Sequence, residues 1–246
     1  MKTVERINYI KKWIIDYCNS MPKKASSLVV GISGGIDSSV ASTLCAMTGI
    51  KTIVLSMPIN QIKDQHKFSL QHQEWLKSKF NNVKGLTIEL DSLFKSFKKT
   101  LVDFDNAHGM ANSKARLRMV TLYQVASANK GIVVGTGNKV EDFGVGFYTK
   151  YGDGGVDISP LADCTKTQVW DMGKELKIGT EIIEAEPTDG LWSDGRTDVS
   201  QLGISYKELE EAMTDPNSPN YKKYLEIRKM NLHKMKAIPV CKMKDE

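Results

Sequence analysis

The chain has 246 residues, a formal net charge of +5, and 26% charged and 41% hydrophobic residues. This balance is typical of a globular protein, and the length suits one α/β domain with a sizeable core, so we expect a single domain over residues 1–246. The modest positive charge fits an anionic small molecule as well as it fits nucleic acid. No apolar run approaches the ~18 residues of a membrane span, so we expect no membrane partner.

The cysteines and the N-terminus indicate a compartment. The N-terminal segment lacks the apolar core of a signal peptide. The four cysteines are far apart in the chain, with neither a CxxC pair nor Cys/His spacing for zinc. We therefore expect reduced thiols and a cytoplasmic location. The cysteines are Cys18, Cys45, Cys164 and Cys241.

The predicted secondary structure alternates between helices and buried strands. Apolar periodicity predicts an amphipathic helix over 3–20 and strands over 27–32, 51–57, 86–90 and 132–134. Further helices are expected over 38–47, 61–80 and 113–129, with a short one beginning at Asp91 and a mobile loop over 103–112. Strands alternating with helices predict an α/β fold: a single doubly wound domain with a mainly parallel sheet flanked by helices.

A glycine-rich turn follows the first predicted strand. Residues 29–39 read VVGISGGIDSS, an apolar strand followed by a Gly/Ser turn and a helix start. Such a turn directs several backbone N–H groups and a helix N-terminus towards one point, which favours a phosphate. The string matches neither GxxxxGK[ST] nor GxGxxG. It has no lysine, and it places Asp37 at the helix start. That carboxylate suits a Mg²⁺ ion.

Two more motifs follow the fourth predicted strand. Residues 135–141 read GTGNKVE, whose small residues suit contact with an adenosine or a phosphate, and Glu141 offers a second hard oxygen ligand for Mg²⁺. Residues 146–157 read GFYTKYGDGGVD, and so many glycines beside Lys150 and two aspartates have no packing rationale. This segment is therefore expected to contact a ligand.

Two helices carry basic candidates. Thr165 and Gln168 form a predicted capping box that places Lys166 at the first helical position, where the helix dipole and the ammonium both favour a phosphate. Arg116 and Arg118 are two residues apart on a helix and cannot face the same way. We expect Arg116 to meet the substrate and Arg118 to lie at the surface or in an interface.

The motifs occur together in one order and at compatible spacing. This ordered set resembles the ammonia-dependent NAD synthetase family, and the resemblance runs from about residue 29 to residue 240. It rests on SGGIDSS, ARLRM (115–119), GTGNKVE, TKYGDGGVD, Pro160-Leu161 with Lys166, Pro187-Thr188, Thr197-Asp198, LGISY (202–206) and His233-Lys234.

The resemblance implies an adenine nucleotide alpha-hydrolase-like fold, with ATP as co-substrate and Mg²⁺ as cofactor. It implies Asp37, Lys150 and Lys166 as catalytic residues, and Asp37 and Glu141 as metal ligands. The implied ATP-binding residues are Gly31, Ile32, Ser33, Gly34, Gly35, Ile36, Asp37, Ser38, Thr136, Lys166 and Thr188. The implied deamido-NAD-binding residues are Arg116, Lys150, Asp157, His233 and Lys234.

The implied reaction is the ATP-dependent amidation of deamido-NAD with ammonia, which gives NAD, AMP and pyrophosphate through an acyl-adenylate. Free ammonia is the expected nitrogen donor, since the synthetase pattern fills the chain and leaves no room for a glutaminase domain. The resemblance also implies a homodimer with the dinucleotide site near its interface. The other partners of the chain are then expected to be small molecules, with no nucleic acid and no membrane.

The chain departs from the family pattern at two positions. Pro187-Thr188 is followed by Asp189-Gly190 where a small residue is usual, and Val199 replaces the second acidic residue expected after Thr197. Both departures lie in a loop expected to cover the active site. We therefore expect them to alter the part of the active site that holds the pyridine ring or ammonia.

Other functions remain open from the sequence. The nearest alternative is the same chemistry on nicotinate mononucleotide. A pyrophosphate-loop tRNA-modifying enzyme is a second, although such enzymes usually add cysteine pairs or an RNA-binding appendage. A non-catalytic adenine-nucleotide-binding module is a third, and it would leave Asp37, Glu141 and the segment 146–157 unexplained.

Overall fold

Four strands form one sheet in the computed structural model, which describes residues 1–60, 63–192 and 194–243. The strand order is β3-β2-β1-β4, and every pairing is parallel. Val29 in the central strand β1 pairs with Ile53 of β2 on one side and with Val133 of β4 on the other. The strands are β1 (Ser27–Gly31), β2 (Lys51–Ser56), β3 (Val83–Thr87) and β4 (Gly131–Val134).

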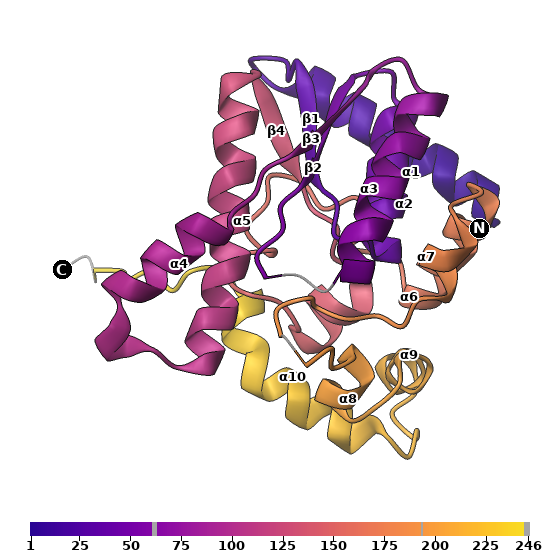
Figure 1. Cartoon of the computed structure of the whole chain (residues 1–246). Helices are drawn as coiled ribbons and strands as arrows, with labels where there is room; N and C mark the ends of the chain where they lie inside the picture. The colour runs from indigo at the N-terminus through magenta and orange to yellow at the C-terminus, as the bar shows by residue number, and fades with distance from the viewer. Residues whose placement is uncertain (61–62, 193, 244–246) are drawn as a thin grey trace.

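Helices alternate with these strands and then continue without further strands as far as Met235 (Figure 1). They are α1 (Thr3–Ser20), α2 (Ile36–Met47), α3 (Lys63–Lys79), α4 (Asp91–Thr100), the 3-10 turn η1 (Val102–Phe104), α5 (Ala107–Ala128), the π-helical turn η2 (Lys139–Val145), α6 (Lys166–Glu175), α7 (Thr180–Glu184), α8 (Asp198–Leu202), α9 (Tyr206–Thr214) and α10 (Tyr221–Met235).

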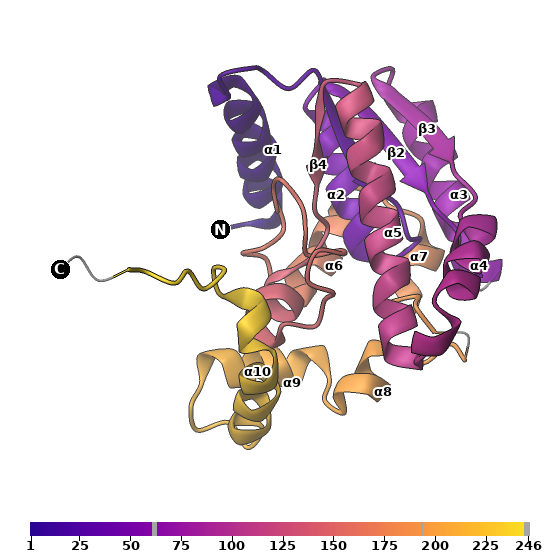
Figure 2. The same ribbon diagram turned by 90° about the vertical axis from the view of Figure 1, so that its left-hand side faces the viewer.

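Successive side chains of a strand point to opposite faces of the sheet, so the apolar strands offer a packing surface on each face. Helices cover both faces. Leu28 and Val30 of β1 pack with apolar residues of α1, α2 and α6. Val29 between them points to the other face, where it packs with residues of α4 and α5 such as Phe94 and Met119. Figure 1 shows α5 on one side of the strands and α1 and α2 on the other, and in Figure 2 α5 lies in front of the sheet. The predicted doubly wound parallel sheet is therefore confirmed.

A third apolar cluster builds a helical layer beyond the sheet. Val140 and Val145 of η2 pack with Leu209 of α9 and Tyr224 of α10. In Figure 1 helices α8, α9 and α10 lie together at one end of the sheet. Because η2 follows β4 directly, this layer stands over the carboxyl ends of the strands, where parallel sheets bind their ligands.

Two elements differ from the sequence prediction by more than two residues. The third strand lies at Val83–Thr87 rather than 86–90, since Thr52 pairs with Val83 and the chain leaves the ladder after Thr87. The expected loop over 103–112 is wrong: α5 already begins at Ala107 because the Asn106 side chain caps it by accepting from the Gly109 N–H at 2.7 Å. Of the expected helix 61–80, residues 61–62 lie outside the described residues.

The structure also describes the cysteines and the lengths of the helices. The four cysteines are free, and Cys241 is the exposed one among them. Within the described ranges, none of the helices combines the length and the apolar character needed to cross a bilayer.

Candidate active site

One cavity of about 900 Å³ lies at the carboxyl ends of β1 and β4. Its volume falls in the usual range for small-molecule sites. It is walled by the turns that follow β1 and β4, by α5, by the loop 185–192 and by α10. All eight residues of the predicted phosphate loop line it, namely Gly31, Ile32, Ser33, Gly34, Gly35, Ile36, Asp37 and Ser38.

The phosphate loop is closed by its own hydrogen bonds. The Ser38 hydroxyl donates to the Gly35 carbonyl at 3.0 Å and accepts from the Ser33 N–H at 3.2 Å. Gly34 has a φ of +92°, which glycine adopts without strain. Since α2 begins at Ile36, its N-terminal amides and its dipole stand directly behind the loop. This arrangement suits an anion such as a phosphate.

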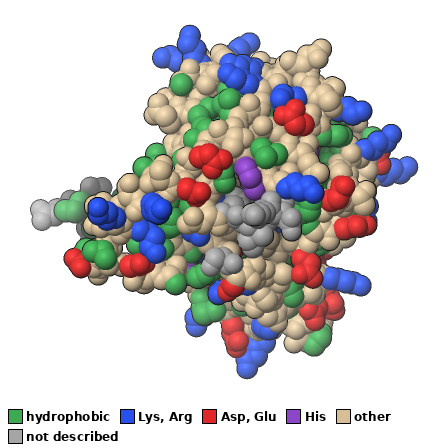
Figure 3. All heavy atoms as spheres, in the orientation of Figure 1, with side chains coloured by type: hydrophobic (Ala, Val, Ile, Leu, Met, Phe, Trp, Pro, Cys, Tyr) green, Lys and Arg blue, Asp and Glu red, His purple; other side chains and the backbone are tan. Residues whose placement is uncertain are grey.

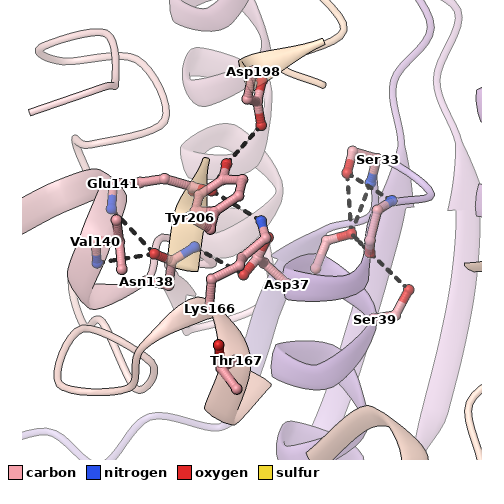
Figure 4. A network of polar contacts seen from close by, with 12 residues as sticks. Ser33, Asp37, Ser39, Asn138, Val140, Glu141, Lys166, Thr167, Asp198 and Tyr206 are labelled. Carbon is pink, nitrogen blue, oxygen red and sulfur yellow. Dashed lines mark hydrogen bonds and ion pairs between the residues drawn. The ribbon is translucent and has the colours of Figure 1, made fainter. Parts of the chain in front are cut away.

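Three charged groups from distant parts of the chain meet beside this loop (Figure 4). Lys166 at the start of α6 has only 2% of its side chain exposed. Its ammonium lies 2.5 Å from Oδ2 of Asp37 in α2 and 2.9 Å from Oε1 of Glu141 in η2. The predicted capping box of Thr165 and Gln168 is present and fixes the start of α6. The structure thus brings together both predicted metal ligands and a predicted ATP-binding lysine.

Polar neighbours hold the two carboxylates in place. The Asn138 amide donates to Oδ1 of Asp37 at 3.0 Å, while its oxygen caps η2 by accepting from the N–H groups of Val140 and Glu141. The Tyr206 hydroxyl lies 2.5 Å from Oε1 of Glu141 and 2.8 Å from Oδ2 of Asp198 (Figure 4). Asn138 and Tyr206 stood inside the quoted motifs, yet nothing in the sequence showed that they support this pair.

Burial and charge act against each other in this cluster. Burial works to lower the pKa of Lys166, but the two carboxylates outweigh it and raise that pKa. Burial also works to raise the pKa of Glu141, but Lys166 and the Tyr206 hydroxyl outweigh it and lower the pKa. For Asp37 burial prevails and raises the pKa. Lys166 therefore carries its positive charge at neutral pH, and Glu141 is ionised.

The donor set suits a divalent cation. Asp37 and Glu141 each place a carboxylate oxygen within 3 Å of one ammonium, so the two oxygens converge on a common point. Hard oxygen donors of this kind are those Mg²⁺ prefers, and the ion usually completes its shell with phosphate oxygens and water. Within the described ranges, no three His, Cys, Asp or Glu side chains form a metal-binding group.

Two threonines occupy the predicted ATP side of the cavity. Thr136 lies in the turn after β4. Thr188 lies in the loop 185–192, where its hydroxyl donates to the Arg196 carbonyl at 3.1 Å and accepts from the Gly190 N–H at 3.2 Å. In the turn after β4, a Cβ at Gly137 would overlap the Asp142 carboxylate, so a larger residue there would require that side chain to move.

Four of the five predicted dinucleotide-binding residues line the same cavity: Arg116, Lys150, His233 and Lys234. The Arg116 Nε–H donates to the Lys150 carbonyl at 3.2 Å, and the Lys150 ammonium lies 3.4 Å from the His233 carbonyl. Lys234 donates to the Tyr148 carbonyl at 2.8 Å and covers the Tyr148 ring. α5, the segment 146–157 and α10 thus combine into one basic wall.

Asp157 lies apart from this wall. It borders a second, more open groove along α5 and β4 and does not line the main cavity. Its two carboxylate oxygens accept from the Tyr123 hydroxyl at 3.0 Å and from the Val133 N–H at 2.7 Å. Its role in substrate binding stays a prediction.

The two departures from the family pattern have different positions. Asp189 lines the cavity, and its carboxylate accepts from the Leu191 N–H at 3.0 Å and from the Gln201 amide at 3.1 Å. Val199 is exposed and does not line the cavity, whereas its neighbour Asp198 is buried and does. The missing carboxylate at 199 therefore leaves the wall of the cavity unchanged.

Arg118 does not lie on the open surface. The side chain is half-buried: its Nε–H donates to the Met57 carbonyl at the end of β2, its Nη2 is buried, and it lines the cavity together with Arg116. Two residues of separation rotate the side chains apart, but the cavity wraps around this part of α5 and meets both. Asp153 was likewise not assigned a role, although it lines the cavity and burial raises its pKa to about 6.

Charges of both signs surround the site. On the face drawn in Figure 3, Lys/Arg and Asp/Glu side chains are intermixed around the margin. The described side chains on this face form no continuous basic band of the kind that follows a nucleic-acid backbone.

A parallel sheet with a phosphate loop after β1, facing a basic wall across one cavity, defines an α/β enzyme that binds nucleotides. Comparison with known proteins narrows this class. The family model described as NAD synthase matches residues 6–246, so the chain belongs to the NAD synthase family. Members of this family are ligases of NAD biosynthesis, and this chain is one of these enzymes.

Three relatives illustrate the family's range. The NH(3)-dependent NAD(+) synthetase of Mesoplasma florum is 37% identical over 231 residues, which cover 90% of this chain and 91% of that protein. The structure of NMN synthetase from Francisella tularensis is 31% identical, with a TM-score of 0.90 over 99% of this chain and 100% of that one. The NH3-dependent NAD synthetase of Campylobacter jejuni, in complex with nitrate, is 22% identical with a TM-score of 0.79 over 98% and 100%, and supports the fold.

Proposed function

We propose that the chain, acting as one domain over residues 1–246, uses ATP and ammonia to convert the carboxylate of a nicotinate nucleotide into an amide. The observation that carries this proposal is the cavity itself. The turn 31–38, the cluster of Lys166, Asp37 and Glu141, and the basic wall with Lys150 and Lys234 all line it, which supports the proposal. Two anionic substrates can therefore meet in one enclosed site.

The chemistry follows from the weakness of a carboxylate as an electrophile. A carboxylate oxygen of the nicotinate attacks the α-phosphorus of ATP, which forms an acyl-adenylate and releases pyrophosphate. Ammonia then attacks the acyl carbon, the bond to the adenylate oxygen breaks, and AMP leaves with that oxygen while a proton is lost. The protein's task is to position the reactants and to offset phosphate charge.

The residues divide this task between them. The N–H groups of the phosphate loop and the start of α2 bind phosphate oxygens, and Lys166 offsets their charge. Mg²⁺, held by Asp37 and Glu141, would supply further charge neutralisation on the phosphates when bound. Thr136 and Thr188 contact ATP from the cavity wall. Each of these roles is a proposal.

We propose deamido-NAD as the preferred acid, because four cations or donors of the basic wall lie together and can serve a second phosphate and an adenosine. The curated relatives named NH(3)-dependent NAD(+) synthetase, such as that of Mesoplasma florum, support this choice. A homodimer is part of the same proposal. Val120 and Tyr123 expose apolar surface on α5 beside the groove that holds Asp157, which suits an interface near the dinucleotide.

Nicotinate mononucleotide is a second candidate, and two observations favour it. The structure with a TM-score of 0.90 is an NMN synthetase, and Asp157, a predicted dinucleotide residue, lies outside the main cavity. The test is to measure kcat/KM for both acids at fixed ATP, Mg²⁺ and ammonia. A higher value for deamido-NAD supports the first proposal, whereas a higher value for the mononucleotide replaces it with the second. Absence of AMP release with either acid would overturn both.

A further inference from the structure

One nitrogen of the Arg118 guanidinium is buried without a hydrogen-bond partner. Its Nε–H donates to the Met57 carbonyl at 3.0 Å. Its Nη2 is buried and has no hydrogen-bond partner. A buried donor left without an acceptor destabilises a protein, and more so when the group is charged. Native proteins rarely retain such a group unless something else completes it.

The charges around Arg118 do not complete it. Burial lowers the pKa of Arg118 to about 10, and the carboxylates of Asp153 and Asp189 oppose that shift. Both carboxylates already have other donors: Asp153 accepts from the Thr149 N–H at 3.0 Å, and Asp189 accepts from Leu191 and Gln201. Among the described residues, neither forms an ion pair with the guanidinium.

Arg118 also lies on a definite side of the cavity. The charges that influence it are Asp153 and Asp189, not Asp37 or Glu141 of the ATP side. Asp153 is in turn influenced by Lys234 of the basic wall. Its bond to the Met57 carbonyl places Arg118 beside the end of β2, and it lines the cavity from the same helix, α5, as Arg116 of the basic wall. Arg118 therefore lies on the side of the cavity assigned to the nicotinate nucleotide.

We propose that Arg118 binds an oxyanion of the nicotinate nucleotide, and that this anion is the acceptor missing from its buried Nη2. The inference rests on the proposed function, because it takes the acid substrate as given. The planar guanidinium of arginine matches a carboxylate or a phosphate with two parallel N–H bonds. The carboxylate and the phosphate of the same nucleotide are the two possible sources of the anion.

The carboxylate source has a direct consequence for turnover. Amidation converts a charged carboxylate into a neutral amide, so an arginine that reads this group binds the substrate more tightly than the product. Its loss would then weaken binding of the acid without weakening binding of the amide. A phosphate-reading arginine would affect acid and amide alike.

The test is to measure the affinity of R118M and R118K for four nucleotides and ATP by calorimetry. The nucleotides are the two acids, deamido-NAD and nicotinate mononucleotide, and their two amides. We expect R118M to weaken the acids roughly 10- to 100-fold and ATP less than about 3-fold, since charge-assisted bonds are the strong ones. R118K should recover part of the loss. Equal weakening of the amides identifies the phosphate; unchanged amides identify the carboxylate.

Controls separate binding from folding and from the reaction itself. R6M removes an arginine from α1, outside the cavity, and should leave all affinities unchanged. R118M should unfold within a few degrees of the wild type, because it removes an incompletely paired buried charge. Acid affinities of a folded R118M within twofold of the wild type would overturn the proposal, as would an equal loss for ATP. Failure of the proposed function would appear separately, as absence of AMP release by the wild type.

Discussion

The ammonium of Lys166 lies 2.5 Å from Oδ2 of Asp37, although 129 residues separate them in the chain. Glu141 adds a second carboxylate 2.9 Å from the same nitrogen. The lysine is almost fully buried, so each charge depends on the others for compensation. A cation is thus already favoured between the two carboxylates that are proposed to bind Mg²⁺.

Asp37→Asn should abolish pyrophosphate release while the fold stays intact. The substitution removes a proposed metal ligand at the phosphate loop, and such a loss costs several kcal/mol of transition-state stabilisation. Asp163→Asn is the matched control, because Asp163 forms an exposed ion pair with Lys139 away from the cavity. Near-normal activity of Asp37→Asn at ordinary Mg²⁺ concentrations would contradict the role assigned to Asp37.

Lys166→Met should lower the free energy of unfolding by about 3–5 kcal/mol, because two buried carboxylates lose their shared partner. The double variant D37N/K166M leaves one buried carboxylate instead of two. Its stability should therefore exceed that of Lys166→Met alone. Denaturant unfolding of the wild type, Asp37→Asn, Lys166→Met and the double variant completes the cycle that measures this coupling. Strictly additive losses would show that Lys166 and Asp37 do not stabilise each other.

Asp198 should make the stability depend on pH. Burial, followed by the charge of Glu141, raises the pKa of Asp198 to about 7 from an ordinary value of 3.8. The Tyr206 hydroxyl has one proton but lies beside two carboxylates, so a protonated Asp198 supplies the second hydrogen bond.

The sign follows from proton linkage. Between pH 3.8 and 7 the folded state holds a proton on Asp198 that the unfolded state has lost, so this contribution to stability falls as pH rises through that window. Relative to Asp198→Asn, the wild type should lose about 1 kcal/mol per pH unit from pH 5 to 7 and nothing further above pH 8. Denaturation curves at four pH values test this, and parallel pH profiles for the two proteins would refute it.

Ammonia should support the reaction, and glutamine free of ammonia should not. A glutaminase of the common kind needs a reactive thiolate. Burial raises the pKa of Cys18, Cys45 and Cys164, so these thiols are inert at neutral pH. The measurement compares AMP formation with each nitrogen source. Sustained turnover on purified glutamine would contradict the prediction.

Local signals in the sequence predicted much of the fold. The apolar strands 27–31 and 51–56 and the turn between Gly31 and Ser38 depend on neighbouring residues, so the pattern of the chain revealed them. The start of α5 was missed because one side chain, that of Asn106, decides between loop and helix. The third strand was shifted because its ends are set by pairing with β2, which no local pattern records.

The candidate site was less predictable, because its contacts join distant segments. The resemblance supplied Asp37, Glu141 and Lys166, but their mutual ion pairs appear only when η2 and α6 fold onto α2. Spacing along α5 separated Arg116 from Arg118 and favoured the first. The enclosure of Arg118 depends on where the end of β2 lies, which spacing alone does not reveal.

The central claim is that the nicotinate carboxylate attacks the α-phosphorus of ATP. The most direct test uses a nicotinate nucleotide whose carboxylate carries ¹⁸O, with ATP, Mg²⁺ and ammonia, followed by mass spectrometry of the products. An acyl-adenylate route transfers one labelled oxygen from the carboxylate to the phosphate of AMP and none to pyrophosphate. AMP without label, or label in pyrophosphate or inorganic phosphate, would contradict the proposed reaction.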